Sequence, residues 1–109
     1  MSDMPYTIND MRNAISEKHV LWSEHALEKM IERNIRKSEI RECILKGEII
    51  EEYLSDKPFP SCLIFVCTDN GRPIHTVCSF DNGVLYIITA YEPTPFKWLD
   101  DHKTRRTVQ

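Results

Sequence analysis

The sequence predicts one α+β domain, residues 1–109, in which N-terminal helices pack on a four-stranded antiparallel sheet and a short basic tail follows. Helical spacing of apolar residues runs from the N-terminus to about Gly47, and short runs rich in β-branched and aromatic residues follow it. Asn-Gly pairs at 70–71 and 82–83 separate the last three runs, and Asn-Gly is a strong hairpin signal. A chain of this length supports one hydrophobic core.

The first helix is predicted to begin after Thr7 and to run to about Lys18. Thr7 is an N-cap candidate with Asp10 three residues further on, which is the spacing of a capping box. The apolar residues of this stretch then share one helical face: Ile8, Met11, Ala14 and Ile15.

Two more helices are predicted before the strands begin. Ser23 is the N-cap candidate of a helix over 24–33, which places apolar side chains on one face and charged side chains on the other. Asn34 is a residue type that ends helices in the left-handed conformation. Ser38 is the N-cap candidate of a short third helix that ends at Gly47.

The second half of the chain predicts four strands, and the last three should form a meander. Their expected ranges are 48–54, 62–68, 73–80 and 84–91. The proline-containing stretch at 57–60 separates the first strand from the second.

The turn lengths determine which side chains share a face of the sheet. If both Asn-Gly turns are two-residue loops, Asp69 pairs with Arg72 and Asp81 pairs with Val84. One face, expected to pack on the helices, then carries Leu63, Phe65, Cys67, Ile74, Cys78, Phe80, Leu85, Ile87 and Tyr91. The other carries Cys62, Ile64, Val66, His75, Val77, Ser79, Tyr86, Ile88 and Ala90. A three-residue loop in either turn reverses part of this assignment.

The second of these faces is too apolar to be open to water, so we expect a cover over it. Three covers are open at this point: the C-terminal tail, a second copy of the chain in a homodimer, or a partner protein. With this register, His75 and Tyr91 point to opposite faces of the sheet.

The composition narrows the class of function. A net charge of -3 gives no general attraction to nucleic acid, so RNA binding would have to rest on a local basic patch. No apolar run approaches the ~20 residues of a membrane span, and the N-terminus lacks a signal-like pattern, which predicts a cytoplasmic protein. The four cysteines show no C-x-x-C spacing, which favours buried structural thiols over disulfides or a zinc site.

Polar residues inside or beside the apolar strands are the first candidates for chemistry. Arg72, His75 and Tyr91 lie within or next to the third and fourth strands. A histidine can act as a general acid or base, and an arginine can hold the charge that develops on a phosphate. Such groups suit metal-free cleavage of RNA through its own 2′-hydroxyl. The plainer interpretation is a buried histidine bonded to its neighbours.

Two further candidates lie on the polar side of the second helix, and a basic cluster ends the chain. His25 and Arg33 are about two helical turns apart, although a solvated face of Glu–Lys pairs explains them equally well. The RNA-binding candidates of the tail are Lys97, Lys103, Arg105 and Arg106, for which the alternative is a frayed terminus.

Several other classes of function find no support in the sequence. There is no H-E-x-x-H, no Gly-rich phosphate loop and no G-x-S-x-G, and we expect neither a metal ion nor a cofactor. The two helices around residues 34–38 could suggest a DNA-binding helix-turn-helix, but the second is short and carries acids among its bases.

Five stretches of the chain form an ordered set of motifs: "WSEHALEKMIERNI", "SEIRECILKGEIIEEY", "GRPIHTV", "YIITAYEP" and "KW" followed by "KTRR". Through them the chain resembles, over residues 22–106, a widespread bacterial and archaeal domain family of unassigned function. The family pairs an H-A-x-x-R/K-M-x-x-R-x-I helix with R-P-x-H-V and I-T-x-Y-x-P strands and a final tryptophan. Its polar positions correspond to His25, Arg33, Arg72, His75 and Tyr91.

The resemblance implies more than the residues do by themselves. Members of the family are often encoded beside zinc-finger antitoxins of the MqsA kind, and the helix-then-meander order is similar to the RelE, MqsR and BrnT toxins, which are small ribonucleases. It therefore implies a RelE-like fold, a toxin-type endoribonuclease acting on free or ribosome-bound RNA, and a cognate antitoxin of zinc-finger type as partner.

The resulting hypothesis assigns a role to each candidate. His75 is the general acid or base, with His25 as a second candidate, Arg72 and Arg33 hold the scissile phosphate, and Tyr91 positions or stacks a base. The alternative is a non-catalytic module that binds a protein or a ligand. A catalytic site should gather His75, Arg72 and another of these groups in one solvent-open concavity, whereas a structural network should bury them with their hydrogen bonds satisfied.

Overall fold

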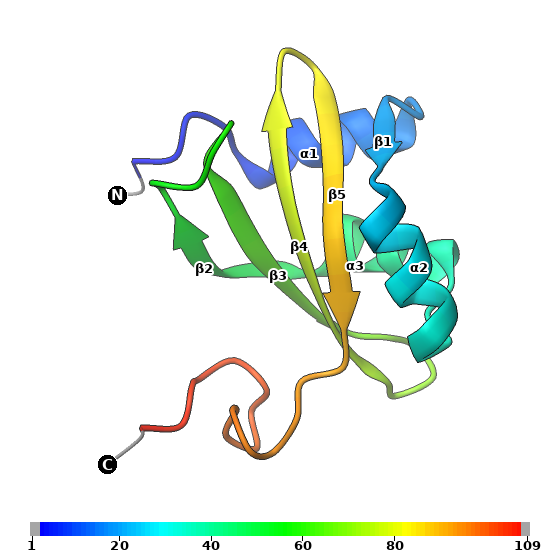
Figure 1. Cartoon of the computed structure of the whole chain (residues 1–109), viewed down its shortest axis with the longest axis vertical. Helices are drawn as coiled ribbons and strands as arrows, with labels where there is room; N and C mark the ends of the chain where they lie inside the picture. The colour runs from blue at the N-terminus through cyan, green and yellow to red at the C-terminus, as the bar shows by residue number, and fades with distance from the viewer. Residues whose placement is uncertain (1–2, 108–109) are drawn as a thin grey trace.

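The structure is a computed structural model that describes residues 3–107. Within these residues, three helices lie on one side of a five-stranded sheet of order β1-β5-β4-β3-β2 (Figure 1). The elements are α1 (Ile8–Ser16), β1 (Val20–Trp22), α2 (Glu24–Arg33), α3 (Lys37–Lys46), β2 (Glu48–Tyr53), β3 (Ser61–Cys67), β4 (Pro73–Asp81) and β5 (Val84–Tyr91). The predicted α+β class is confirmed, and β2 to β5 form the predicted antiparallel meander.

The sheet has one strand more than the four predicted, and it is mixed rather than purely antiparallel. β1 pairs in parallel with β5 at the edge of the sheet, where Val20 lies opposite Leu85. Backbone hydrogen bonds from Leu85 to His19 and from Ser23 to Ile87 extend this pairing at both ends. Three residues are too few to show strand alternation, so β1 depends on the tertiary edge that β5 offers it.

The helix caps follow from local side-chain chemistry. Thr7 and Asp10 form the predicted capping box, and the Ser23 hydroxyl accepts the amide of Ala26. Asn34 ends α2 in the left-handed conformation at φ 54°. The first helix ends at Ser16, earlier than predicted, because Lys18 takes a left-handed conformation at φ 64°.

Ser38 does not cap the third helix, so the predicted start of that helix was also wrong. α3 begins at Lys37, because the Glu39 carboxylate accepts the backbone amide of Arg36 at 2.9 Å. Gly47 follows its end as predicted. A Cβ atom there would lie 2.3 Å from the carbonyl oxygen of Cys43 and 2.6 Å from that of Phe65, so the close approach of α3 to β3 requires glycine.

The hairpin between β3 and β4 has a three-residue loop rather than the expected two. The amide of Thr68 donates to the carbonyl oxygen of Arg72, and Cys67 lies opposite Pro73, which leaves residues 69–71 as the loop. The predicted pairing of Asp69 with Arg72 was therefore wrong. This length moves the whole of β3 by one residue relative to β4 and so exchanges its two faces.

The hairpin between β4 and β5 has the predicted two-residue turn, and Asp81 lies opposite Val84. Asn82 and Gly83 both have positive φ, as a type I′ turn requires. A β-bulge then inserts Ile88 opposite the step from Val77 to Cys78. Beyond the bulge, His75 lies opposite Tyr91, so the predicted placement of these two side chains on opposite faces was wrong.

The three-residue loop at 69–71 and the bulge at Ile88 determine which side chains lie on each face of the sheet. The core between sheet and helices includes Cys62, Ile64, Val66, Ile74, Cys78, Leu85, Ile87 and Ala90. Pairing places Leu63, Phe65, His75, Val77, Ser79, Tyr86 and Tyr91 on the opposite face. For β3 and for Ala90 and Tyr91 the predicted faces were thus reversed, whereas most of β4 and the first half of β5 were assigned correctly.

The C-terminal segment, residues 92–107, lies at the lower end of the sheet in Figure 1, and its Trp98 and His102 rings pack on His75 and Phe65 of this second face, so the tail is one of its covers. Trp98 is 2% exposed and stands edge-on to His75, with 4.5 Å between ring centroids. The carboxylate of Asp101 accepts the amides of Lys103 and Thr104, which forms the turn of this segment and lowers the pKa of Asp101 to about 2. We call residues 92–107 the C-terminal strap.

Candidate functional site

His75 lies at the centre of the covered face and is completely buried. Its Nε2 atom is 2.6 Å from the carbonyl oxygen of His102 in the strap, and its Nδ1 atom is 3.4 Å from the hydroxyl of Tyr91. A carbonyl oxygen only accepts, so Nε2 must carry the proton. In the neutral ring, Nδ1 is then an acceptor, and the Tyr91 hydroxyl donates a long hydrogen bond to it.

Burial favours the neutral forms of both side chains. Burial lowers the pKa of His75 below its usual value of 6.5, although the His102 carbonyl and the charge of Glu51 act in the opposite direction. Burial also raises the pKa of the Tyr91 phenol above its usual value of 10.0. At neutral pH, the pair is therefore an unprotonated imidazole nitrogen that faces a protonated phenol.

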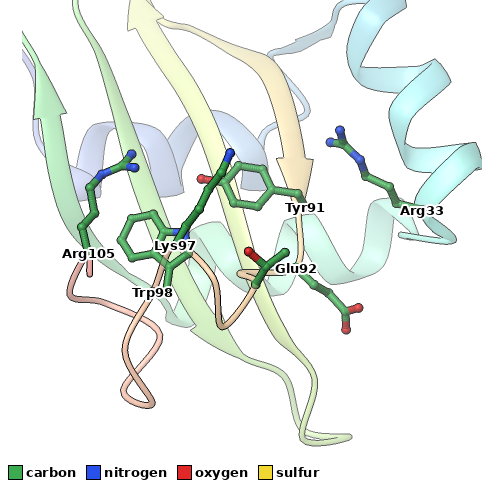
Figure 2. Close-up of a pocket in the computed structure, with 7 residues that line it drawn as sticks. Arg33, Tyr91, Glu92, Lys97, Trp98 and Arg105 are labelled. Carbon is green, nitrogen blue, oxygen red and sulfur yellow. The ribbon is translucent and has the colours of Figure 1, made fainter. Parts of the chain in front are cut away.

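Tyr91 connects this buried pair to an open pocket of about 400 Å³. The pocket lies between the end of α2, the end of β5 and the strap, and Figure 2 shows Tyr91 between Arg33 on one side and Arg105 on the other. Its lining residues are Arg33, Tyr91, Glu92, Thr94, Lys97, Trp98 and Arg105. We call it the Tyr91 pocket.

The three cations of the Tyr91 pocket differ in how far protein groups neutralise them. Arg33 uses Nη1 to bind the carbonyl oxygen of Ala90 at 2.8 Å, and within residues 3–107 no carboxylate pairs with it. The ammonium of Lys97 has no ion-pair or hydrogen-bond partner in the same part of the chain. Arg105 stacks on Trp98 and forms a two-pronged ion pair with Glu51, at 2.7 and 3.0 Å.

Hydrogen bonding to Arg105 and Tyr53 lowers the pKa of Glu51 in spite of its partial burial, and the bond to Glu51 raises the pKa of Arg105. The Glu51–Arg105 pair is therefore charged at neutral pH and contributes almost no net charge to the pocket. Arg33 and Lys97 remain as its two uncompensated positive charges. An anion is the ligand that such a pocket favours.

Arg72 does not line the Tyr91 pocket. Its guanidinium donates to the carbonyl oxygens of Arg33 and Asn34 at the end of α2, at 2.9 and 2.7 Å. It also forms ion pairs with Glu39 and Glu92 at 3.0 and 2.9 Å. Of these two glutamates, Glu92 lines the pocket. Its carboxylate points away from the Tyr91 ring (Figure 2). Arg72 thus ties α2, α3 and the end of β5 together.

The remaining sequence candidates lie apart from the pocket. His25 is exposed in the first turn of α2. Lys103 forms an ion pair with Glu48 at 2.7 Å, and Arg106 lies 4.0 Å from Asp100. Of the four basic residues assigned to RNA binding, the structure therefore brings Lys97 and Arg105 to the pocket and places Lys103 and Arg106 elsewhere.

The contributors to the site that were not predicted include Glu51, the carbonyl of His102 and Trp98 as the cover of His75. Glu51 lies in β2 opposite Leu63, on the same face as His75, so its part in the site depends on the register of the β2–β3 pair. The carbonyl of His102 carries no signal in the sequence. The final tryptophan was recognised only as part of the family pattern.

The cysteines follow the prediction of structural thiols in three of four positions. All four are free, and Cys43, Cys62 and Cys78 are buried, whereas Cys67 is exposed at the end of β3. Burial raises the pKa of the Cys43 thiol to about 12, which makes it unreactive. Over residues 3–107, no group of three His, Cys, Asp or Glu side chains is placed to hold a metal ion.

The family model described as "Domain of unknown function (DUF4258)" matches residues 22–92, from the end of β1 to the first residue after β5. The chain belongs to the DUF4258 family. The matched range contains Arg33, Arg72, His75 and Tyr91, and it ends before Lys97, Trp98 and Arg105. The predicted extent to residue 106 is thus longer than the match, and the likeness to the RelE, MqsR and BrnT toxins stays a prediction.

No curated protein and no solved structure matches this DUF4258 chain. Among its described residues, none of the helices has the length and apolar character that crossing a membrane requires.

Proposed function

We propose that the DUF4258 chain is a metal-free endoribonuclease with a RelE-like arrangement of helices and sheet, and that the Tyr91 pocket binds the scissile phosphate. One observation carries the proposal: two uncompensated cations, Arg33 and Lys97, border a phenol whose proton is directed at a buried, neutral histidine. Anion binding and a path for a proton thus meet at one point of the surface.

The pocket's dimensions and charges suit one phosphate and part of its nucleotide. A volume of about 400 Å³ lies within the usual range of small-ligand sites. Arg33 keeps Nε and Nη2 without a partner among the described residues, so two guanidinium donors are available for phosphate oxygens. Lys97 supplies a second, flexible positive charge. Arg105 adds donors while Glu51 fixes its orientation.

The Tyr91–His75 pair accounts for the proton of the attacking group. The 2′-hydroxyl oxygen of RNA forms a bond to phosphorus while the bond from phosphorus to the 5′-oxygen breaks. The 2′-hydroxyl proton passes to the Tyr91 oxygen as the Tyr91 proton passes to Nδ1 of His75, so no phenolate accumulates. The Lys97 ammonium gives a proton to the leaving 5′-oxygen. The products are a 2′,3′-cyclic phosphate and a 5′-hydroxyl.

This scheme changes three of the roles expected from the sequence, those of His75, Arg72 and Tyr91. His75 acts through Tyr91 and does not touch the substrate, because it is fully buried. Arg72 stabilises the end of α2, which carries Arg33, and does not contact the phosphate. Arg33 keeps its expected role, and Tyr91 becomes the group that exchanges protons with RNA.

A cognate antitoxin of zinc-finger type remains part of the proposal, on the strength of the resemblance to toxin families. A second hollow of about 520 Å³, largely apolar, supports it by offering a partner protein a surface away from the Tyr91 pocket. The hollow lies between the edge strand β1, the middle of β5 and the loop before β3. Its aromatic and aliphatic residues include Leu21, Trp22, Phe59, Tyr86 and Ile88.

A non-catalytic anion-binding module is the second candidate, and one observation favours it. Both nitrogens of His75 have partners and the ring is sealed from solvent, which is the pattern expected of a structural network. This module would use the same Arg33 and Lys97 to bind an anion but would cleave nothing.

The deciding experiment incubates the purified chain with total RNA and with ribosome-bound message, in EDTA, and identifies the ends of any products. Tyr91→Phe keeps the ring and removes the hydroxyl, so the cleavage rate should fall about 10²-fold or more. Lys97→Gln should also lower it, whereas Lys103→Gln, whose lysine is paired with Glu48, should not.

The results separate the two candidates. Cleavage that leaves 2′,3′-cyclic phosphate ends and disappears in Tyr91→Phe supports the ribonuclease. Equal cleavage by wild type and Tyr91→Phe contradicts the assigned site. RNA binding that weakens in Lys97→Gln, without cleavage by the wild type in either RNA preparation, favours the non-catalytic module.

A further inference from the structure

The most exposed large apolar side chain beside the Tyr91 pocket is unexplained by the packing of the fold. Phe96 is 90% exposed, although it lies two residues before the buried Trp98 and directly before Lys97. Trp98 already provides the apolar contact between the strap and the sheet. The Phe96 ring therefore contributes little to folding and is available to another molecule.

The backbone holds Phe96 in a defined place. The amides of Lys97 and Trp98 both donate to the carbonyl oxygen of Thr94, at 3.2 and 3.0 Å, which closes one tight turn over residues 94–98. Thr94 and Lys97 line the Tyr91 pocket, so the ring projects from a turn that also forms the wall of the pocket. The backbone that carries the ring is therefore already ordered, so ligand binding has to order only the side chain.

We propose that Phe96 is a stacking platform for an unpaired base of single-stranded RNA whose phosphate lies in the Tyr91 pocket. This inference rests on the proposed RNA-binding function and names its substrate class. An aromatic ring next to a cation is the combination that single-strand binders use, because every base offers a π-face and every nucleotide a phosphate. Neighbouring residues are ~3.8 Å apart at Cα, so Phe96 and Lys97 can serve adjacent groups of one strand.

The same features disfavour duplex RNA as the ligand. Bases of a duplex are stacked on one another and are unavailable to an exposed ring, whereas a loop or a single strand can turn a base outward. Binding along a duplex also requires a row of free cations. The strap offers Lys97 alone, since Lys103, Arg105 and Arg106 each lie against a carboxylate.

The test measures the binding of a labelled 2′-O-methyl RNA 10-mer, which lacks the attacking hydroxyl and stays intact. Phe96→Leu retains an apolar side chain without a π-face and should weaken binding about 5-fold to 150-fold, the usual range for one stacked base. Phe96→Trp should bind as tightly as wild type, and its added tryptophan fluorescence should be quenched. Ile31→Ala, at an 83% exposed position of α2, is the matched control and should change nothing.

Two further measurements test the Phe96 platform separately from the proposed binding of RNA in the Tyr91 pocket. Binding of inorganic pyrophosphate should be equal in wild type and Phe96→Leu, and the wild type should bind a duplex of the same sequence at least 10-fold more weakly than the single strand. If Lys97→Gln weakens RNA binding but Phe96→Leu does not, the pocket binds RNA and the platform is wrong.

Other results reject the platform for different reasons. If Phe96→Leu loses pyrophosphate binding as well, the ring shapes the pocket instead of stacking on a base. If sedimentation shows a self-association that Phe96→Leu abolishes while RNA binding stays intact, the ring belongs to a protein interface. If the wild type binds neither RNA nor pyrophosphate, the proposed function itself fails and the platform fails with it.

Discussion

Tyr91 and Arg72 show, at the scale of single residues, how the number of protein partners decides what a polar side chain can do. Arg72 spends its donors on two backbone carbonyls and two carboxylates. Tyr91 has one long hydrogen bond to His75 and otherwise faces the pocket. A side chain whose hydrogen bonds are already made forms few new ones with a ligand. Tyr91 and the unpaired Lys97 can still form them.

The buried His75 predicts a specific dependence of stability on pH. Its pKa is lowered in the folded chain, so the unfolded chain takes up the proton first as the pH falls through about 6.5. The stabilising contribution is present above that pH and is lost below it, at up to about 1.4 kcal/mol per pH unit until the folded pKa is reached. Urea unfolding of wild type between pH 7.5 and 5 should show this loss.

Substitution tests the assignment to His75. His75→Gln should be less stable at pH 7.5 and should show a shallower pH dependence than wild type. Val77→Ala is a control on the same face of β4, and it should lose stability but keep the steep dependence. Equal slopes for wild type and His75→Gln would assign the pH dependence to other groups.

Arg72→Gln should lower stability and should weaken anion binding much less than Arg33→Gln does, because its only effect at the pocket is to free the Glu92 carboxylate. The variant removes charged hydrogen bonds to the end of α2 and leaves Glu39 and Glu92 without their partner, which should cost about 2 kcal/mol in the free energy of unfolding. Arg33→Gln should show the reverse, with weakened pyrophosphate binding and little change in stability. Calorimetry for binding and urea unfolding for stability measure both. A large loss of affinity in Arg72→Gln would return this residue to the site.

At the scale of the elements, the candidate site depends on the strap, which supplies several of its groups and covers part of the sheet face. Its turn over 94–98 supplies Lys97 and Trp98, and its second turn brings the His102 carbonyl onto His75. Ion pairs from Lys103 and Arg105 to β2 hold it on the sheet. The strap has few long-range backbone hydrogen bonds, so its position depends on Trp98 and these ion pairs.

Trp98→Ala should destabilise the chain by about 3–5 kcal/mol, because it leaves a cavity over His75 and removes the contact between strap and sheet. Phe96→Ala changes a comparably large side chain in the same turn and should alter stability by less than about 0.5 kcal/mol, since that ring is exposed. Equilibrium unfolding in urea compares the two. Similar losses would show that Phe96 also packs against the fold.

The sequence predicted elements whose cause is local and missed those whose cause is tertiary. The caps at Thr7 and Ser23 and the Asn82–Gly83 turn follow from side-chain chemistry within four residues. The β1 strand exists because β5 offers it an edge. The bulge at Ile88 and the three-residue loop at 69–71 each change the register by one residue, and one residue exchanges the faces of a strand.

The candidate site was likewise predicted where its cause is local and missed where its cause is tertiary. Arg33, His75, Tyr91, Lys97 and Arg105 were all predicted from residue type and from the resemblance, and the structure brings them to one region. Their roles could not be predicted, because exposure and partners depend on the register and on the path of the strap. Arg72 was misplaced for this reason, since its position directly before β4 gives no sign of the carbonyl groups that it reaches at the end of α2.

At the scale of the whole molecule, a net charge of -3 is compatible with RNA binding because the free positive charge is concentrated. Most basic residues of the strap are matched by carboxylates of β2 or of the strap itself. Arg33 and Lys97 remain uncompensated at the Tyr91 pocket. Acidic residues elsewhere should repel a long nucleic acid, so the chain should contact few phosphates.

The salt dependence of RNA affinity measures how many phosphates the cations of the chain contact. Two free cations that release counterions from a single strand give a slope of about -1.4 for the logarithm of the association constant against that of the salt concentration. Lys97→Gln should reduce this slope to about -0.7, and Lys103→Gln should leave it unchanged, because Glu48 already neutralises that lysine. The measurement uses the uncleavable 10-mer between 50 and 300 mM salt. If Arg33 and all four basic residues of the strap contacted phosphates, the slope would approach about -3.5, and a value that steep would mean that the strap exchanges its carboxylate partners for RNA.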